Sequence, residues 1–300
     1  KQFFSENDLT DVLALIRKKN NFDMVHVSIQ EEEAFFVRIR LPFMEIQEIR
    51  GATELHLEEY IPYAAPDVEF DYEIIITDPR PDGYVDVNVS VLPKMVVKKY
   101  LEIFSTTGFR PILFMVEAEA TARAVVRKGE GDVVMVVNMG RQSTVLSIVV
   151  RGLVWFSYTI KFGGDFLTER LVKSCSITTA EAERSKMKKG LVNTPENQDV
   201  FDCLLPSVSS IRDEISKHYL FWSRHRKESF MAQNEEEITK IILCGSQAAI
   251  PGIVDYISTA MGVTAELCNP WVNILNIEQY VPSIKKDDVL EYATTLGLIK

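Results

Sequence analysis

Residues 131–164 decide the fold, and they read GDVVMVVNMGRQSTVLSIVVRGLVWFSYTIKFGG. The segment from Asp132 to Asn138 is almost entirely apolar, which predicts a strand that is buried on both faces. Two more apolar runs follow, each joined to the run before it by a short turn that contains glycine. Three consecutive strands with such short connections predict an antiparallel meander. The turns span residues 139–142 and 151–152, the later strands span residues 143–150 and 153–160, and a helix starts at Gly163-Gly164.

The sequence after this meander alternates between helices and short strands. Helical spacing of apolar residues predicts helices over about 165–174 and 179–189. Pro206 is predicted to precede a long helix, since proline is tolerated only at the start of a helix. The remaining predicted elements are strands over 240–244 and 264–268 and helices over 251–261 and 288–296. Such alternation is typical of an α/β architecture.

The part of the chain before the meander has a different pattern. Apolar residues at helical spacing near the start are followed by two alternating strands and then by an acidic helix that Pro62 ends. Two more strands and a helix follow. We predict helices over 9–16, 44–60 and 95–104 and strands over 25–29, 35–41, 73–77 and 85–91. The order predicts a small α+β unit over residues 1–92.

Composition excludes several classes of protein. A chain of 300 residues is long enough for two domains, and 43 acidic against 33 basic residues give a net charge of −10. That acidity argues against a nucleic-acid-binding protein, which needs basic surface. No apolar run approaches the roughly 20 residues that span a bilayer, and the first residues do not resemble a signal peptide. Four dispersed cysteines fit a reducing compartment, so we expect a cytoplasmic protein that is not inserted in a membrane.

The residue types that could take part in binding or catalysis favour phosphate binding and predict no more specific activity. Glycine-containing turns after strands let backbone N–H groups approach a phosphate, although any tight turn also requires glycine. The four histidines show no metal-binding spacing, and no nucleophile motif or Walker loop is present. We therefore predict no catalytic residue and no metal ligand. The turns in question lie at residues 139–144, 162–164 and 245–247.

The order of these turns resembles the actin, Hsp70 and sugar-kinase superfamily. Its second phosphate loop is similar to residues 138–144 followed by Gly163-Gly164. The sequence AERSK at 182–186 resembles its glutamate–lysine helix, which contacts ribose, and residues 241–252 resemble its adenosine motif. The resemblance implies the actin-like, ribonuclease H-like fold with two lobes.

A more specific resemblance is to the family of the type IV pilus assembly protein PilM, and it covers essentially the whole chain. The resemblance is carried by the segments RIRLP at 38–42, EEYIPY at 58–63, VEAEATARA at 116–124, FGGD at 162–165, NPW at 269–271 and YATTLGL at 292–298. Members share with the division protein FtsA a small α+β subdomain inserted in the first lobe. The resemblance divides the chain into an inserted subdomain at 1–92, the rest of the first lobe at 93–130, a second-lobe core at 131–178, a helical subdomain at 179–235, and further second-lobe core with a return helix at 236–300.

The family resemblance implies a nucleotide site, from which this chain departs in several places. Asn138 stands where the family has an aspartate that holds magnesium through water. Arg141 either pairs with a phosphate or fills the turn with charge. The family's first strand and Asp-x-Gly phosphate loop would precede Lys1, so we expect weak or absent ATP binding and little help from Mg²⁺. The residues implied to surround ATP are Asn138, Gly140, Gln142, Ser143, Thr144, Gly163, Gly164, Glu183, Lys186, Gly245, Ser246 and Gln247.

The resemblance also implies a partner. Members of this family act as cytoplasmic scaffolds at the inner membrane, together with other pilus assembly proteins, and bind the short cytoplasmic tail of a single-pass protein, PilN. The predicted partner-binding residues are Glu58, Ile61, Pro62 and Tyr63. Three alternatives remain: a GspL-like scaffold of a type II secretion system, an active sugar-kinase-like phosphotransferase, and an FtsA-like polymer.

Overall fold

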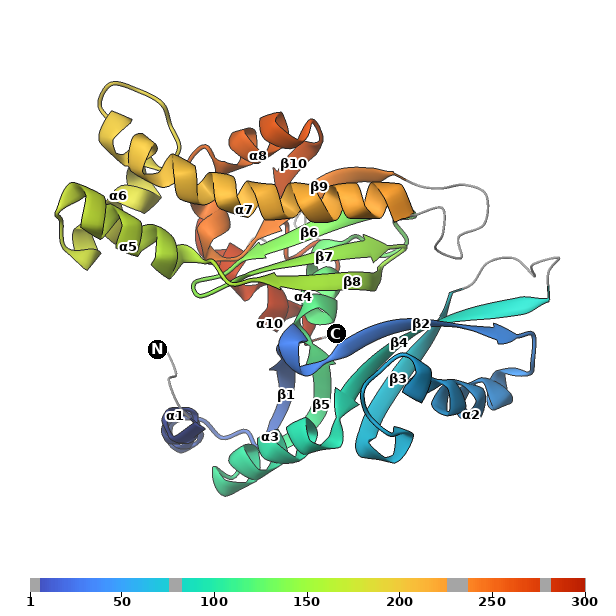
Figure 1. Cartoon of the computed structure of the whole chain (residues 1–300). Coiled ribbons are helices and arrows are strands. Elements are labelled where there is room, and N and C mark those ends of the chain that lie inside the picture. Colours follow the sequence, from blue (N-terminus) through green and yellow to red (C-terminus); the bar gives the residue numbers. More distant parts are fainter. Residues whose placement is uncertain (1–5, 76–82, 226–236, 276–281, 300) are drawn as a thin grey trace. The chain divides into compact units, whose positions relative to one another are not determined.

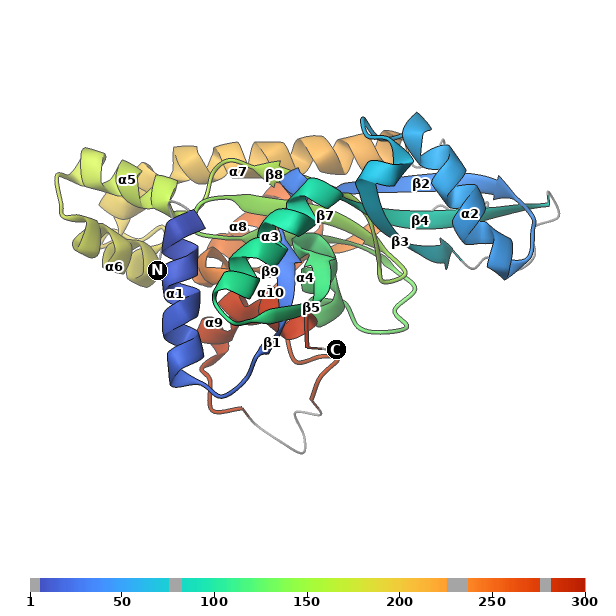
Figure 2. The same ribbon diagram turned by 90° about the horizontal axis from the view of Figure 1, so that it is seen from below.

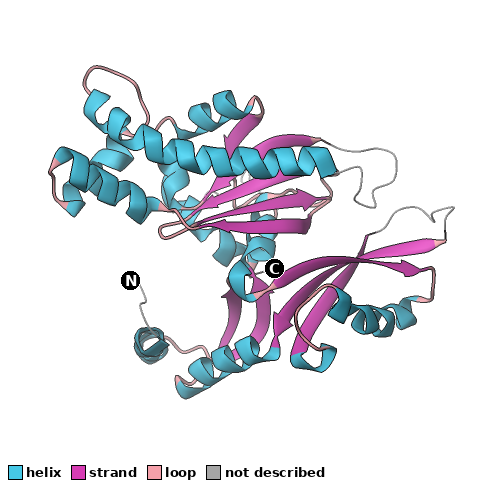
Figure 3. Cartoon of the chain, in the orientation of Figure 1, coloured by secondary structure: helices cyan, strands magenta, loops and turns pink. Residues whose placement is uncertain are grey.

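The computed structural model describes residues 6–75, 83–225, 237–275 and 282–299, and all structural statements concern these residues. They form two compact units, of which the first ends at Glu117 and the second runs from Ala118 to Leu298. Figures 1 and 3 show the helices and strands of each unit.

A five-stranded sheet forms the centre of the second unit. Strands β6 (Val133–Met139), β7 (Thr144–Val150) and β8 (Leu153–Ile160) pair antiparallel in sequence order. Strand β9 (Ile238–Cys244) pairs parallel with β6, and β10 (Thr264–Leu267) pairs parallel with β9. The order β10-β9-β6-β7-β8 confirms the predicted meander. Strand β6 lies at the middle of the sheet, between β9 and β7, and this position explains why its sequence is so apolar.

Helices cover both faces of this sheet. Figure 1 shows α7 (Gln198–His225) along one face, and α4 (Glu117–Val125) and α10 (Ala293–Gly297) beyond the other. Helix α10 packs directly on α4, where a hydrogen bond of 2.8 Å joins the hydroxyls of Thr121 and Thr294. The other helices of this unit are α5 (Gly164–Cys175), α6 (Thr179–Lys189), α8 (Ile253–Met261) and α9 (Lys286–Val289). Helices α5, α6 and α8 match predicted helices within a few residues. The single helix predicted over 288–296 is instead divided into α9, a 3-10 turn at Leu290–Tyr292 and α10.

The start of α7 differs from the prediction. Pro206 was expected before the helix, but α7 begins at Gln198 and contains Pro206. Proline removes one backbone donor and crowds the preceding turn. The helix nevertheless continues, because Val200, Leu204 and Val208 on both sides of the proline are buried in the core. Tertiary packing here outweighs the local preference.

The first unit contains a parallel pair of strands. Strand β1 (Met24–Ile29) pairs with β5 (Arg110–Val116). Helices α1 (Glu6–Lys19) and α3 (Lys94–Thr106) belong to this part and pack on each other, as Figure 2 shows. A small core of Val27, Ile29, Phe104 and Phe109 joins the strands to α3.

A separate three-stranded sheet lies between β1 and β5 in the sequence. Strands β2 (Phe35–Pro42) and β3 (Val68–Ile75) both pair antiparallel with the central strand β4 (Tyr84–Pro93). Helix α2 (Ile46–His56) crosses one face of this sheet in Figures 1 and 2. The core between them contains the buried side chains Ile39, Leu41, Ile49, Leu57, Ile61, Val68, Val87, Val89 and Val91.

The three-stranded sheet and α2 span about residues 35–93, and the predicted division of the chain, with an inserted subdomain at 1–92, stays a prediction. Because β1 pairs with β5, the sequence before residue 30 belongs with the parallel pair, and the three-stranded subdomain is inserted between two neighbouring strands. Alternation of apolar residues predicts a strand but not its partner. Helix α4, placed at 93–130 with the first lobe, groups with the second unit. The predicted strand at 73–77 starts earlier, at Val68, and its last two residues lie outside the described residues.

Candidate functional site

The candidate site forms where the β6–β7 turn meets the start of α5. The Gly140 N–H donates to the Ser143 carbonyl at 3.0 Å, which closes the turn. The Gly164 N–H donates to the Gly140 carbonyl at 3.1 Å, and the Asp165 N–H donates to the Arg141 carbonyl at 2.8 Å. The two glycine turns therefore lie side by side, as predicted. The same contacts occupy two N–H groups at the start of α5, which are the donors that a helix offers to a phosphate.

Glycine at position 163 is required by close approach. A Cβ atom there would lie 2.6 Å from the Arg141 carbonyl oxygen and equally close to the backbone of Gln142. The hydroxyl of Thr144 donates to the Phe162 carbonyl at 2.9 Å and holds the same junction from the strand side. The junction is thus packed backbone against backbone.

Lys186 is the most unusual side chain of the site. It lies on α6 and is completely buried. Its ammonium donates to the Gly164 carbonyl at 3.0 Å and to the Thr168 hydroxyl at 2.8 Å, and it lies 2.8 Å from the Glu183 carboxylate. An ammonium has three protons, and these three acceptors use all of them. Lys186 therefore ties α6 to the first turn of α5.

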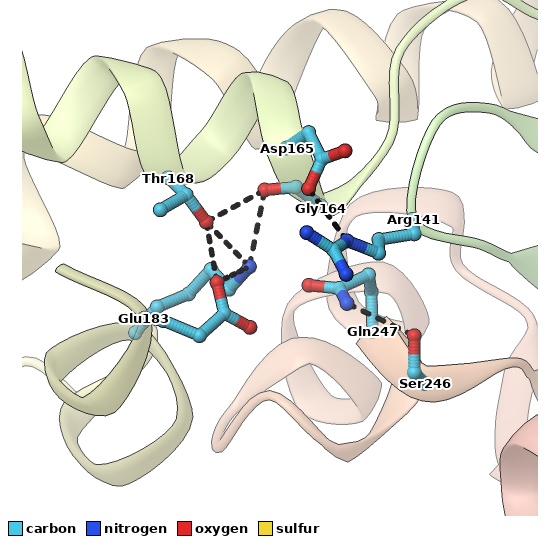
Figure 4. Close-up of polar contacts among 8 residues, drawn as sticks. Arg141, Gly164, Asp165, Thr168, Glu183, Ser246 and Gln247 are labelled. Carbon is cyan, nitrogen blue, oxygen red and sulfur yellow. Dashed lines mark hydrogen bonds and ion pairs between the residues drawn. The ribbon is translucent and has the colours of Figure 1, made fainter. Parts of the chain in front are cut away.

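Glu183 completes this cluster from the solvent side. Its carboxylate accepts a hydrogen bond of 2.6 Å from Thr168, as Figure 4 shows. Partial burial raises the pKa of Glu183, but the hydrogen bonds from Lys186 and Thr168 outweigh it and hold that pKa below 4.5. Burial lowers the pKa of Lys186, against the opposing effect of Glu183. The half-exposed carboxylate thus balances a buried cation.

Arg141 forms an ion pair at the edge of the site. Its Nε atom lies 2.9 Å from the Asp165 carboxylate, and this contact raises the pKa of the guanidinium (Figure 4). The side chain of Arg141 is 66% exposed. Of the two interpretations of Arg141, phosphate pairing or filling the turn, the ion pair with Asp165 favours the second.

The turn after β9 closes the site from a third direction. Gln247 is only 3% exposed and points toward Gly164 in Figure 4, where a Cβ atom added to Gly164 would overlap its carboxamide. Its Nε2 donates to the Ser246 hydroxyl at 3.0 Å, while its Oε1 has no hydrogen-bond partner among the described residues. Gly245 has φ +84°, and a Cβ there would lie 2.6 Å from the Asn138 amide oxygen. This region of φ strongly favours glycine.

These contacts bring all the predicted nucleotide-site residues into one cluster. Sequence reasoning missed Thr168, which hydrogen-bonds both charged members of the Glu183–Lys186 pair. The available signal was its position one helical turn after Gly164. The clustered residues are Asn138, Gly140, Gln142, Ser143, Thr144, Gly163, Gly164, Glu183, Lys186, Gly245, Ser246 and Gln247.

The predicted partner-binding segment is only partly accessible. Ile61 is 5% exposed and belongs to the core under α2, so its side chain offers little surface to a partner. Tyr63 packs against Phe35 with ring centroids 5.7 Å apart and is half-buried. Pro62 is exposed, and the exposed Glu58 accepts a hydrogen bond of 2.9 Å from the Ala65 N–H.

The described residues contain neither a candidate metal site nor a candidate membrane-spanning helix. No group of three or more histidine, cysteine, aspartate or glutamate side chains could hold a metal ion there. In the same ranges, every helix is too short or too polar to cross a bilayer.

Comparisons with known proteins agree with this geometry. The family of the type IV pilus assembly protein PilM matches residues 2–299. A solved structure described as a PilM-PilN type IV pilus biogenesis complex is similar over 97% of this chain and 83% of the other, with 19% identity and a TM-score of 0.73. MreB5 of Spiroplasma citri bound to ADP is similar over 68% of this chain and 63% of the other, with 14% identity and a TM-score of 0.50. The chain has the actin-like fold.

The glycine contacts predict two different responses to alanine. Gly164→Ala should lower the free energy of unfolding by about 2 kcal/mol, because the new methyl group overlaps the buried Gln247 side chain. Gln247→Ala should relieve most of that loss in the double variant. Gly163→Ala should not be relieved by Gln247→Ala, because its clash is with backbone. Urea unfolding of five variants measures this: the three single variants and the two double variants that combine Gln247→Ala with each glycine substitution. Equal relief by Gln247→Ala at both glycine positions would contradict the packing.

The Glu183 carboxylate predicts a pH dependence of stability. Because the pKa of Glu183 in the folded chain lies below its ordinary value, its contribution is complete above about pH 4.5 and is lost as the pH falls through the folded value. Glu183→Gln should therefore lose less stability than the parent between about pH 6 and pH 3. Glu169→Gln, at an exposed position on α5, is the control. Identical acid profiles for the parent and Glu183→Gln would refute the assignment.

Proposed function

The chain belongs to the family of the type IV pilus assembly protein PilM, and from this membership we propose that it is an actin-like scaffold of pilus assembly. In this proposal it lies at the cytoplasmic face of the inner membrane. There it binds the cytoplasmic tail of a PilN-like single-pass protein and contacts other assembly proteins. The observation that carries the proposal is the similarity, over 97% of the chain, to a protein solved as a PilM-PilN complex.

Charge supports a basic tail as the bound segment. The chain carries a net charge of −10, and the region of α2 and the turn after it contributes five glutamates within fifteen residues. Such a surface attracts a peptide that carries lysine or arginine and increases its rate of association. The acidic region comprises Glu45, Glu48, Glu54, Glu58 and Glu59.

We further propose that ATP binds weakly or not at all to this chain. The Gly164 and Asp165 N–H groups donate to carbonyls of the neighbouring turn, and the Lys186 ammonium donates to three acceptors of the chain itself. A phosphate would have to displace these bonds, and each displaced donor or acceptor would lose a partner in a buried place. The proposed scaffold role does not require ATP hydrolysis.

We expect magnesium to have little effect on nucleotide affinity because of Asn138. An amide has no charge, so it holds the water of a hydrated Mg²⁺ less strongly than the aspartate that the family resemblance implies. The Asn138 amide also lies close to the Gly245 backbone. Magnesium should therefore add little to nucleotide affinity.

Calorimetric titration of the full chain with ATP tests the nucleotide proposal. We expect a Kd no tighter than micromolar, with or without magnesium, because the phosphate donors are already bonded. Asn138→Asp should not produce tight binding, since it adds a cation ligand but frees no N–H donor. A sub-micromolar Kd, or turnover of about 1–100 per second as in typical kinases, would contradict the proposal.

Charge reversal on α2 tests the partner proposal. A fluorescent peptide of about 20 residues, long enough to fill a groove, is taken from the cytoplasmic N-terminus of the proposed PilN-like single-pass protein and titrated with the full chain. Glu54→Lys should raise the Kd about threefold to tenfold at low salt, because the exposed Glu54 carboxylate attracts the basic tail.

The matched control is Glu169→Lys, which changes the net charge equally but lies on α5 in the second unit. We expect less than a twofold change from it. Equal effects of the two reversals would mean that net charge alone acts and would remove α2 from the proposed tail site. No binding of the peptide to any form would end the scaffold proposal.

A further inference from the structure

Two of the four cysteines meet where α5 and α7 pack together. The Sγ atoms of Cys175 and Cys203 lie 3.4 Å apart. The other two cysteines, Cys244 and Cys268, are buried, and the Cys244 thiol points to the Val137 carbonyl. A disulfide requires sulfurs about 2.05 Å apart. The Cys175–Cys203 pair can therefore be joined by a modest approach of two side chains.

The helices place both thiols at the border of the core. Cys175 ends α5, one turn after the buried Leu171. Cys203 lies on α7 next to the buried Leu204. Both thiols are partly exposed, so a small reagent can reach them, whereas Cys244 and Cys268 are shielded. The packing of α5 on α7 keeps the two thiols next to each other.

The charges around the pair determine how readily it reacts. Burial raises the pKa of Cys175 to about 11, and the hydrogen bond with Cys203 and the nearby Asp199 act in the same direction. Lys189 opposes them, and it forms an ion pair of 3.3 Å with Asp199. The Cys175 thiol therefore stays protonated near neutral pH, and its exchange is slow there, because the thiolate is the attacking form.

We propose that Cys175 and Cys203 form a redox-active dithiol that a low-molecular-weight disulfide oxidises to an intramolecular disulfide. One thiolate attacks a sulfur of the reagent and releases one reagent thiolate. The second cysteine, as thiolate, then attacks the cysteine sulfur of this mixed disulfide and releases the second reagent thiolate. The two cysteines are oxidised, the reagent disulfide is reduced to two thiols, and the two cysteine protons end on these thiols.

The bond would act on the candidate site through α5. This helix starts at Gly164 and carries Asp165 and Thr168 in its first turns, while Cys175 is its last residue. A disulfide to Cys203 would fix the far end of α5 to α7. The inference rests on this geometry alone and is independent of the proposed function.

The test uses the full chain and glutathione disulfide at about pH 8.5, because thiol–disulfide exchange proceeds through the thiolate and is faster at alkaline pH. We expect the protein to lose the mass of two hydrogen atoms, and digestion should yield one linked peptide pair that contains Cys175 and Cys203. The melting temperature should rise by about 5 °C or more, because the bond restricts the unfolded chain. Dithiothreitol should reverse both changes.

Cys203→Ala is the control variant, and Cys175 should then retain a glutathione adduct with no rise in melting temperature. The peptide mapping of the parent chain needs no variant, so it decides the matter even if Cys203→Ala folds poorly. A persistent glutathione adduct on the parent chain, a link to Cys244 or Cys268, or a disulfide between two chains would overturn the proposal.

Discussion

The buried ammonium of Lys186 requires hydrogen-bond acceptors and a counter-charge, and this requirement constrains how the segments of the second unit pack. Its charge is completely buried, and transfer of an unpaired charge from water would cost several kcal/mol. The contacts with Gly164, Thr168 and Glu183 meet this need only if α5 and α6 keep their present positions. Because Gly164 N–H in turn donates to Gly140, the requirement extends to the β6–β7 turn. One buried cation thus couples three segments that are distant in sequence.

Much of this arrangement could be predicted from the sequence, for a physical reason. Strand β6 is apolar on both faces because it is central in the sheet, and tight turns with glycine follow it. Such patterns are local, so the meander and the start of α5 could be read directly. The twelve nucleotide-site residues followed from the family resemblance, and the structure brings them into one cluster. Their role in binding nucleotide stays a prediction.

The features that sequence reasoning missed depend on distant contacts. Alternation in residues 25–29 predicted β1, but only the structure shows that it pairs with β5, more than eighty residues away. Pro206 suggested a helix start, yet core packing on both sides of it continues α7. Ile61 follows an exposed, acidic turn, but its side chain fills the core under α2. In each case a neighbour supplied by tertiary structure outweighs the local signal.

For an actin-like fold the usual question is which nucleotide it binds. In the present geometry, the polar groups of the site are bonded within the chain, so the fold does not require a bound nucleotide to satisfy them. The glutamate and lysine that the resemblance assigns to ribose form an ion pair with each other here. The Gly164 and Asp165 N–H groups, which could otherwise bind a phosphate, donate to the Gly140 and Arg141 carbonyls. Internal bonds of this kind satisfy the same polar groups that a ligand would satisfy, so the lobe can keep its shape without one. A scaffold needs a persistent shape and an accessible partner surface, whereas an enzyme needs groups left free for its substrate. The internal bonds of the site provide such a persistent shape and therefore support the proposed scaffold role.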